Sequence, residues 1–147
     1  MIAVVQRVRS AGVFIDEPPH VETIGAGLCV LLGVEEDDTV EDAKWTAKKL
    51  ANLRIFNDED RKMNLSILNT RGEILLISQF TLAGDCTQGN RPSFIKAAKP
   101  EIAEPLVEQV GTLLMEYKLP VKQGVFGAMM QVKIENDGPV TIILKRD

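Results

Sequence analysis

The sequence predicts an α+β fold with mostly antiparallel strands, and its 147 residues fit a single domain, 1–147. Three observations support this prediction. Apolar or alternating segments typical of strands recur along the chain between turn sequences. Only two stretches have the 3.6-residue apolar period of a helix. Strands and helices also do not alternate one to one, as they would in a wholly parallel sheet.

The expected strands follow the apolar segments in chain order. Two of them flank the turn-rich sequence Asp16-Glu-Pro-Pro-His, which predicts a hairpin. The segment 28–34 is apolar throughout, as expected of a central strand. Asn136-Asp-Gly-Pro is expected to be a turn between the last two strands. The predicted strands lie at 2–8, 13–15, 21–24, 28–34, 54–56, 73–80, 130–135 and 140–144.

The first helix is expected to begin near Asp38, because Asp38 and Glu41 resemble a capping box. Its apolar stripe is Val40, Ala43, Ala47, Leu50 and Ala51. The second helix is expected from about Pro100 to Tyr117, with Pro105 acceptable only near the first turn. The second stripe is Ile102, Leu106, Val110, Leu113, Leu114 and Tyr117.

Composition argues against several classes of protein. The net charge of −4 disfavours tight, sequence-independent binding of nucleic acid over a broad basic face. Two cysteines, Cys29 in an apolar run and Cys86 in a polar loop, do not make a disulfide framework. The first residues are typical of a strand rather than a signal peptide, and no apolar run is long enough for a membrane span. We therefore expect a cytoplasmic protein without a membrane partner.

The side chains available for catalysis are few. The one histidine, His20, lies in the Pro-Pro turn and is expected to be a solvated loop residue. A Ser-His-Asp or Cys-His arrangement therefore has little support, and neither a zinc site nor any other metal or cofactor is expected.

One polar cluster follows an apolar strand. Strand alternation would place Ser78 and Phe80 on one face, and Gln79 and Thr81 on the other. The cluster is compatible with a functional site or with ordinary strand-end hydrogen bonds. Two later segments, Arg91-Pro-Ser-Phe and Asn136-Asp-Gly-Pro-Val-Thr, are each typical of turns when taken alone.

Together these segments resemble a known family. Ser78-Gln-Phe-Thr-Leu, Arg91-Pro-Ser-Phe and Asn136-Asp-Gly-Pro-Val-Thr, in this order, resemble the D-aminoacyl-tRNA deacylases. Further agreement comes from Gln6-Arg-Val and Lys62-Met-Asn-Leu, and the resemblance covers essentially the whole chain. It implies two packed sheets with a helical layer, a homodimer, and hydrolysis of the ester of D-aminoacyl-tRNA and of mischarged glycyl-tRNA.

The resemblance also implies roles for particular residues. Gly138-Pro139 would be a cis pair that reaches into the active site of the other subunit, with Arg7 holding that loop. The pocket that it enters would contain the catalytic segment Ser78, Gln79, Phe80 and Thr81. Phe126 and Met130 would support the pocket, with Phe126 beside the terminal adenosine. Met129 departs from the family, in which an acidic residue is expected in many members.

A backbone wall suits a chiral filter, because it excludes an L side chain without reading which side chain it is. We expect catalysis by positioning of the ester and a water molecule, with the N–H groups of Phe80 and Thr81 stabilising the oxyanion. The 2′-hydroxyl of the terminal ribose is a candidate for assistance. Thr81 as a covalent nucleophile is the alternative mechanism.

The expected partner is the 3′ acceptor end of aminoacylated tRNA. Arg91, Lys96 and Lys99 are candidates for contacts with its phosphates, although a solvated charged helix start explains them equally well. Three other functions remain open from the sequence. They are a non-catalytic dimeric module that binds an RNA end or small ligand, an editing enzyme with a trans Gly-Pro that attacks L-alanyl-tRNA, and a general esterase.

Overall fold

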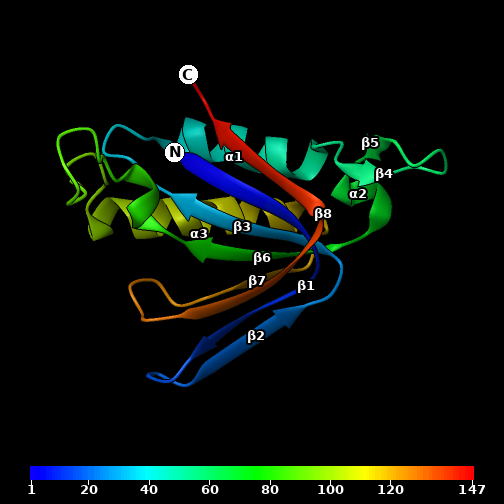
Figure 1. Cartoon of the computed structure of the whole chain (residues 1–147), viewed down its shortest axis with the longest axis horizontal. Coiled ribbons are helices and arrows are strands. Elements are labelled where there is room, and N and C mark those ends of the chain that lie inside the picture. Colours follow the sequence, from blue (N-terminus) through cyan, green and yellow to red (C-terminus); the bar gives the residue numbers. More distant parts are fainter.

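The computed structural model describes residues 1–147 and shows a bent sheet with two long helices packed on one face (Figure 1). The six-stranded sheet consists of β1 (Ile2–Ile15), β2 (His20–Ile24), β3 (Gly27–Gly33), β6 (Glu73–Ser78), β7 (Val121–Gln123) and β8 (Gln131–Lys145). The helices are α1 (Val40–Asn52), α2 (Ile67–Thr70) and α3 (Pro100–Glu116). A two-stranded sheet, β4 (Phe56–Asn57) with β5 (Met63–Leu65), and a 3₁₀ helix (Phe80–Ala83) complete the fold.

The α+β class is confirmed, but the sheet is mixed rather than mostly antiparallel. β1 pairs antiparallel with β2, β3 and β8, whereas β3 with β6 and β6 with β7 are parallel. The order is β2-β1-β3-β6-β7. The parallel pairs arise because α1 and α2 lie between β3 and β6, and α3 lies between β6 and β7, so each connection is a crossover. The two expected sheets are thus one continuous sheet folded over itself.

Two long strands each take the place of two expected ones. β1 runs unbroken from Ile2 to Ile15, and its end pairs with β2 in the expected hairpin. β8 runs from Gln131 to Lys145 and pairs with β1 along both of its halves. The turn expected at Asn136-Asp-Gly-Pro is instead a bulge within β8 at the bend of the sheet.

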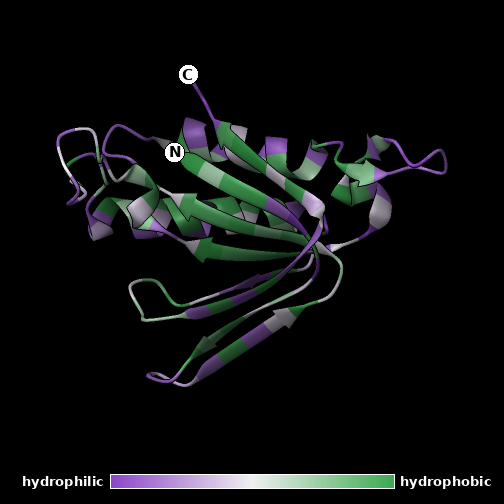
Figure 2. Cartoon of the chain, in the orientation of Figure 1, coloured by the Kyte–Doolittle hydropathy of each residue, from purple (hydrophilic) through white to green (hydrophobic).

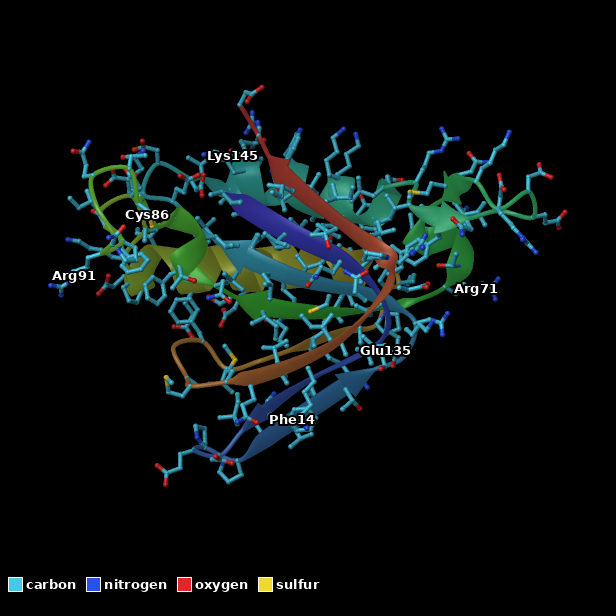
Figure 3. The ribbon with its side chains drawn as sticks, in the orientation of Figure 1. Phe14, Arg71, Cys86, Arg91, Glu135 and Lys145 are labelled. Carbon is cyan, nitrogen blue, oxygen red and sulfur yellow. The ribbon has the colours of Figure 1, made fainter.

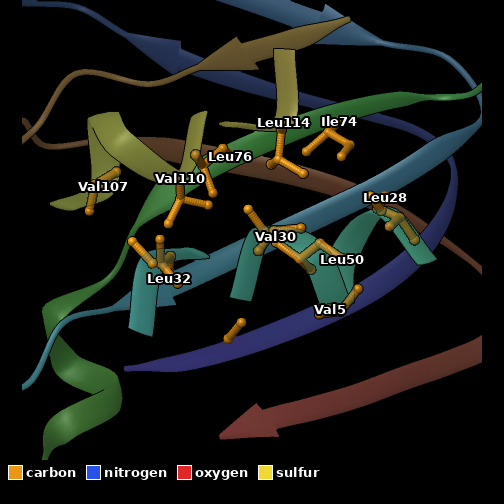
Figure 4. Packing of buried hydrophobic residues seen from close by; sticks show 14 of the residues in the cluster. Val5, Leu28, Val30, Leu32, Leu50, Ile74, Leu76, Val107, Val110 and Leu114 are labelled. Atoms are coloured by element: carbon orange, nitrogen blue, oxygen red, sulfur yellow. The ribbon is translucent and has the colours of Figure 1, made fainter. Parts of the chain in front are cut away.

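The folded-over sheet buries side chains on both of its faces. The larger core lies between the sheet and the helices α1 and α3, and Figure 4 shows Val30, Leu50 and Leu114 meeting there. The smaller core lies on the opposite face and includes Val13 of β1 and Ile77 of β6. Figure 2 shows the apolar residues concentrated along β1, β3 and β6, with polar residues on the outer loops. This double burial explains why residues 28–34 and 74–77 are continuously apolar.

The cap of α1 lies one residue after the expected position. Thr39 is the N-cap, and the carboxylate of Asp42 accepts the Thr39 backbone N–H at 2.8 Å and its hydroxyl at 3.3 Å. Asp38 instead accepts the backbone N–H of Glu35 at 2.7 Å, so it is engaged outside the helix. Val40, expected in the apolar stripe, is 47% exposed because it lies in the first turn, ahead of the buried Ala43.

The buried face of α3 is rotated from the predicted stripe. Ile102 and Tyr117 are exposed, while Ala103, Val107 and Gly111 are buried instead. Small residues face inward because the helix lies close to the sheet: a Cβ at Gly111 would lie 2.5 Å from Gln123 Nε2. Pro105 occupies the second turn, on the exposed side. No helix combines the length and the apolar character needed to cross a membrane.

Candidate functional site

A mostly apolar cavity of about 550 Å³ lies where β6 ends. Its lining comes from the end of β6, the start of α3 and the segment before β8: Val34, Ile77, Ser78, Gln79, Phe80, Ala98, Pro100, Ala103, Phe126, Gly127, Ala128, Met129, Met130 and Val132. The carboxyl ends of the parallel strands β3 and β6 meet here, which is where open parallel sheets bind ligands. The predicted residues Ser78, Gln79, Phe80, Phe126 and Met130 are thus brought together around one cavity.

The chain changes conformation sharply at the end of β6. Gln79 donates its backbone N–H to Leu32 at 2.8 Å, and the 3₁₀ helix begins at the next residue. The alternation expected through Thr81 therefore stops at Ser78. A Cβ at Gly33 would lie 2.9 Å from the Gln79 carbonyl oxygen, so the close approach of the two segments requires glycine there.

Thr81 lies outside the cavity lining and contacts Gln79 instead. The Gln79 side-chain Nε2 donates to Thr81 Oγ1 at 2.6 Å, which holds the amide across the start of the 3₁₀ helix. The backbone N–H groups of Phe80 and Thr81 open that helix, and the first N–H groups of a helix have no acceptor within it. They are therefore free to bind an incoming oxygen atom.

The rim of the cavity contains an aromatic pair that the sequence patterns missed. Phe80 is 55% exposed and meets Phe94 edge-to-face, with ring centroids 5.2 Å apart. A Cβ at Gly84 would lie 3.0 Å from the Phe94 ring, so Gly84 leaves room for it. Met129, in the segment before β8, also lines the cavity and is 91% exposed. Phe94 falls inside the recognised Arg91-Pro-Ser-Phe segment, which was the available signal.

The three predicted phosphate-binding side chains are all exposed but lie at different distances from the cavity along the chain. Lys99 is the N-cap of α3 and stands between the lining residues Ala98 and Pro100. Lys96 lies two residues before Ala98. Arg91 lies farther out on the loop after the 3₁₀ helix, at the end of the molecule that also carries Cys86 (Figure 3).

The Gly138-Pro139 pair forms the exposed tip of the bulge in β8, and its peptide bond is cis. Arg7, 7% exposed, lies under this bulge. Its Nε donates to the Asp137 carbonyl oxygen at 3.0 Å and its Nη1 to the Ile55 carbonyl oxygen at 2.7 Å. The Asp137 carboxylate lies 3.6 Å from Nε of both Arg7 and Arg9.

The bulge is remote from the cavity of its own chain. Arg7, opposite the bulge, pairs with Leu28, which pairs with Ile74, four residues before Ser78. That offset is roughly 13 Å along the strands, and β8 and β6 are a further three strand spacings, roughly 14 Å, apart. The Gly138-Pro139 tip therefore does not reach the Ser78 cavity within one chain.

The cysteines and the histidine lie outside the cavity lining. Burial raises the pKa of the Cys29 thiol to about 12, while Cys86 is exposed. His20, expected to be a solvated loop residue, begins β2 and its Nε2 lies 2.8 Å from the Gln123 carbonyl oxygen. No group of three or more His, Cys, Asp or Glu side chains is gathered as a metal site.

Known proteins resemble this chain over its full length. The family model described as "D-Tyr-tRNA(Tyr) deacylase" matches residues 4–145. A protein of Thermosipho africanus named "D-aminoacyl-tRNA deacylase" is 53% identical over 144 residues, covering 98% of this chain and 96% of that protein. A protein of the same name from Clostridium botulinum, strain Alaska E43, is 54% identical with the same coverage.

Two solved structures have the same fold. One, described as "c-Myc DNA Unwinding Element Binding Protein", has a TM-score of 0.90 at 42% identity and covers 100% of this chain and 99% of that one. The other, a "probable eukaryotic D-amino acid tRNA deacylase", has a TM-score of 0.83 and covers 97% of each chain. At 16% identity the second likeness concerns the fold alone. The family match and the full-length relatives at more than half identity lead to one conclusion: the chain belongs to the D-Tyr-tRNA(Tyr) deacylase family.

Proposed function

We propose that this protein hydrolyses the ester bond of D-aminoacyl-tRNA, and of mischarged glycyl-tRNA, as a proofreading enzyme of translation. Family membership supports the reaction. The observation that carries the chiral part is the exposed Gly138-Pro139 bulge braced by the buried Arg7. Such a bulge presents backbone atoms outward from a fixed position, as a side-chain-independent filter requires.

The protein acts as a homodimer in this proposal, with the bulge of one protomer entering the Ser78 cavity of its partner. The support is geometric: the bulge is exposed, and it lies too far from the cavity of its own chain to act there. A filter formed by Gly138 and Pro139 must therefore be supplied in trans. The cavity is open enough to admit the terminal adenosine with its ester.

The terminal adenosine packs against the apolar wall formed by Phe126 and Met130. The ester carbonyl then lies near the start of the 3₁₀ helix. The backbone N–H groups of Phe80 and Thr81 stabilise the oxyanion that forms when water attacks. The water oxygen bonds to the carbonyl carbon, the carbon–oxygen bond to the ribose breaks, and the ribose oxygen takes up a proton. Ser78 and the Gln79 amide orient the ester and the attacking water molecule. The ribose 2′-hydroxyl assists the proton transfer.

Chiral selection follows from the position of the partner's backbone. The carbonyl groups of Gly138 and Pro139 occupy the space into which an L side chain would project from the α-carbon. A D side chain projects outward and makes no contact that depends on its identity. Rejection by a clash gives strict chirality with broad tolerance, and glycine passes because it has no side chain to exclude.

The first experiment measures release of label from D-tyrosyl-tRNA and L-tyrosyl-tRNA in parallel, with purified protein and no added metal. We expect rapid loss of the D form while the L form is spared. Hydrolysis of neither substrate would favour the binding module, and hydrolysis of both would remove the role of Gly138-Pro139. Free D-tyrosine ethyl ester and L-alanyl-tRNA serve as further substrates, because their rapid hydrolysis would favour the esterase and the L-alanyl editing enzyme.

The tRNA is held mainly by its 3′ end, with Lys99 and Lys96 contacting nearby phosphates and Arg91 reaching farther along the acceptor. This is consistent with a net charge of −4. We expect the logarithm of the binding constant to fall with the logarithm of salt with a slope of about −1 to −3, because few phosphates are neutralised. A slope near that of about ten phosphate contacts would contradict this mode of binding.

A further inference from the structure

The bulge that carries Gly138-Pro139 contains three more residues than its partner strand. Gln6 pairs with Thr141 and Val8 pairs with Asn136, so one residue of β1, Arg7, stands opposite four residues of β8. The backbone groups of those four residues lack the regular partners of a sheet. Gly138 and Pro139 are exposed, but Asp137 is half-buried and Val140 is buried. Because an unpaired backbone group is costly in a protein interior, other groups must bind the main chain at these two ends if the bulge is to keep one shape.

One side chain supplies the missing bonds at the end of the bulge. The Oδ1 atom of Asn136 accepts the Val140 backbone N–H at 2.8 Å, and its Nδ2 atom donates to the Val140 carbonyl oxygen at 3.2 Å. The same Nδ2 atom lies 3.2 Å from Thr141 Oγ1. A primary amide has the acceptor and donor of a peptide group, so Asn136 replaces the partner strand at Val140.

The two ends of the bulge are held by different parts of the chain. At its start, Arg7 binds the Asp137 carbonyl oxygen. At its end, the Val140 side chain is buried in the larger core while Asn136 binds its main chain. Pro139 directly precedes Val140, so the position of the Pro139 carbonyl depends directly on the contacts of Asn136.

We propose that Asn136 is a positioning residue for chiral selection: its amide closes the bulge and sets how far Gly138 and Pro139 project. This inference rests on the proposed function, in which those carbonyl groups exclude an L side chain. Asn136 touches no reacting atom. Its loss removes both bonds to the Val140 main chain and lets the tip move, and a small displacement can turn a clash into a tolerated contact.

The experiment compares kcat/KM for D-tyrosyl-, L-tyrosyl- and glycyl-tRNA in the wild type and the Asn136→Ala variant. We expect the D/L ratio to fall at least about tenfold, which corresponds to about 1.4 kcal/mol, mainly through faster hydrolysis of the L substrate. The rate with glycyl-tRNA should stay within about threefold, since glycine is not subject to the clash. Circular dichroism and sedimentation establish that the variant is folded and dimeric.

Two controls separate positioning from general stability. Asn69→Ala removes a similarly bonded amide from the cap of α2, where Asn69 Oδ1 accepts the Ser66 backbone N–H at 2.9 Å. It should lower stability and leave the D/L ratio unchanged. Thr141→Val removes one acceptor of the Asn136 amide but keeps both bonds to Val140, and should preserve the ratio within about threefold.

If Asn136→Ala does not fold, Asn136→Asp carries the test, because it keeps the acceptor for Val140 but cannot donate to its carbonyl oxygen. A folded Asn136 variant with the wild-type D/L ratio would overturn the inference while the proposed function stands. A wild type that hydrolyses neither substrate, or does not discriminate between them, would instead overturn the proposed function itself.

Discussion

The guanidinium of Arg7 donates from Nε to the carbonyl oxygen of Asp137 at 3.0 Å, across a separation of 130 residues in sequence. A second donor of the same side chain binds the Ile55 carbonyl oxygen. One buried cation thus joins the bulge of β8 to the segment leading into β4. The bulge consequently moves with the body of the protein and not as an independent loop.

Replacing Arg7 should therefore affect stability and selectivity together. Arg7→Ala leaves two backbone carbonyl groups without donors and should reduce the free energy of unfolding by about 2–4 kcal/mol. Urea denaturation measures this loss, and the D/L ratio should fall in the folded fraction. Arg9→Ala is the matched control, because Arg9 also lies 3.6 Å from the Asp137 carboxylate but is 72% exposed. The free energy of unfolding of Arg9→Ala should differ from that of the wild type by no more than about 0.5 kcal/mol. Equal losses of stability in Arg7→Ala and Arg9→Ala would contradict this account.

Gly138 should not tolerate a side chain. Its φ is +132°, and a Cβ would lie 2.9 Å from Val140 Cγ2 and 3.0 Å from Arg7 Nη2. Gly138→Ala should destabilise the protein by more than about 1 kcal/mol and reduce discrimination against L-tyrosyl-tRNA. Gly89→Ala is the control, since no atom lies within 4 Å of its Cβ position. Thermal unfolding compares the two, and similar melting temperatures would contradict the prediction.

Thr81 distinguishes the two mechanisms. If its role is to hold the Gln79 amide at 2.6 Å, Thr81→Val should slow single-turnover hydrolysis of D-tyrosyl-tRNA by no more than about tenfold. A covalent nucleophile is indispensable, so a loss of about a thousandfold or more, with an acyl-enzyme detected by mass spectrometry in the wild type, would favour Thr81 as that nucleophile. Thr87→Val, on the neighbouring loop, is the control for removal of a hydroxyl group.

The cap of α1 should make stability depend on acidic pH. The Thr39 N–H, with smaller contributions from its hydroxyl and from Arg146, holds the pKa of the Asp42 carboxyl below its usual value. The carboxylate therefore stabilises the fold fully above its ordinary pKa of about 3.9, and this contribution is lost as pH falls through the lower folded-state pKa. Urea denaturation from about pH 5 to about pH 3 should show a smaller decrease for Asp42→Asn than for the wild type. Identical pH profiles would exclude the contribution.

The thiols of Cys29 and Cys86 should differ in reactivity, because one is buried and the other is exposed. Because burial raises the pKa of Cys29 to about 12, its thiolate is scarce at pH 8, whereas Cys86 is exposed. Iodoacetamide should add one carboxamidomethyl group to the native protein and two after denaturation, as counted by mass spectrometry. Two additions to the native protein would contradict the burial of Cys29.

Local sequence patterns predicted the elements better than their connections. The hairpin between β1 and β2 and the apolar strand β3 follow from residues that interact with near neighbours or with one uniform core. The capping box was misplaced because Asp38 and Thr39 are both good N-caps, and only the three-dimensional contacts of Asp38 decide between them. The rotation of α3 was missed because the large apolar residues Ile102 and Tyr117 fit the predicted stripe, whereas close packing on the sheet buries the face that contains Ala103 and Gly111.

For the candidate site, too, the sequence identified the residues better than their arrangement in space. The family resemblance predicted that Ser78, Gln79, Phe126 and Met130 lie in one pocket, and the structure places all four around one cavity. The spacing of residues did not predict that Thr81 would turn away to contact Gln79, because that depends on where β6 stops. Nor did it predict that Asn136-Asp-Gly-Pro would be a bulge, since a bulge is defined by the register of a strand 130 residues earlier.

The pairing of β1 with β8, from Ile2 opposite Lys145 to Phe14 opposite Gln131, has a consequence for biosynthesis. β1 leaves the ribosome long before β8, so the edge of β1 that pairs with β8 stays uncovered until β8 has been made. Contacts between such distant parts of a chain form slowly, and an uncovered strand edge invites pairing with other chains in the meantime. The bulge at Gly138-Pro139 takes shape only when β8 pairs with β1. The cavity is also incomplete until then, because Val132 of β8 lines it, so the pocket and the proposed filter are completed in the same step.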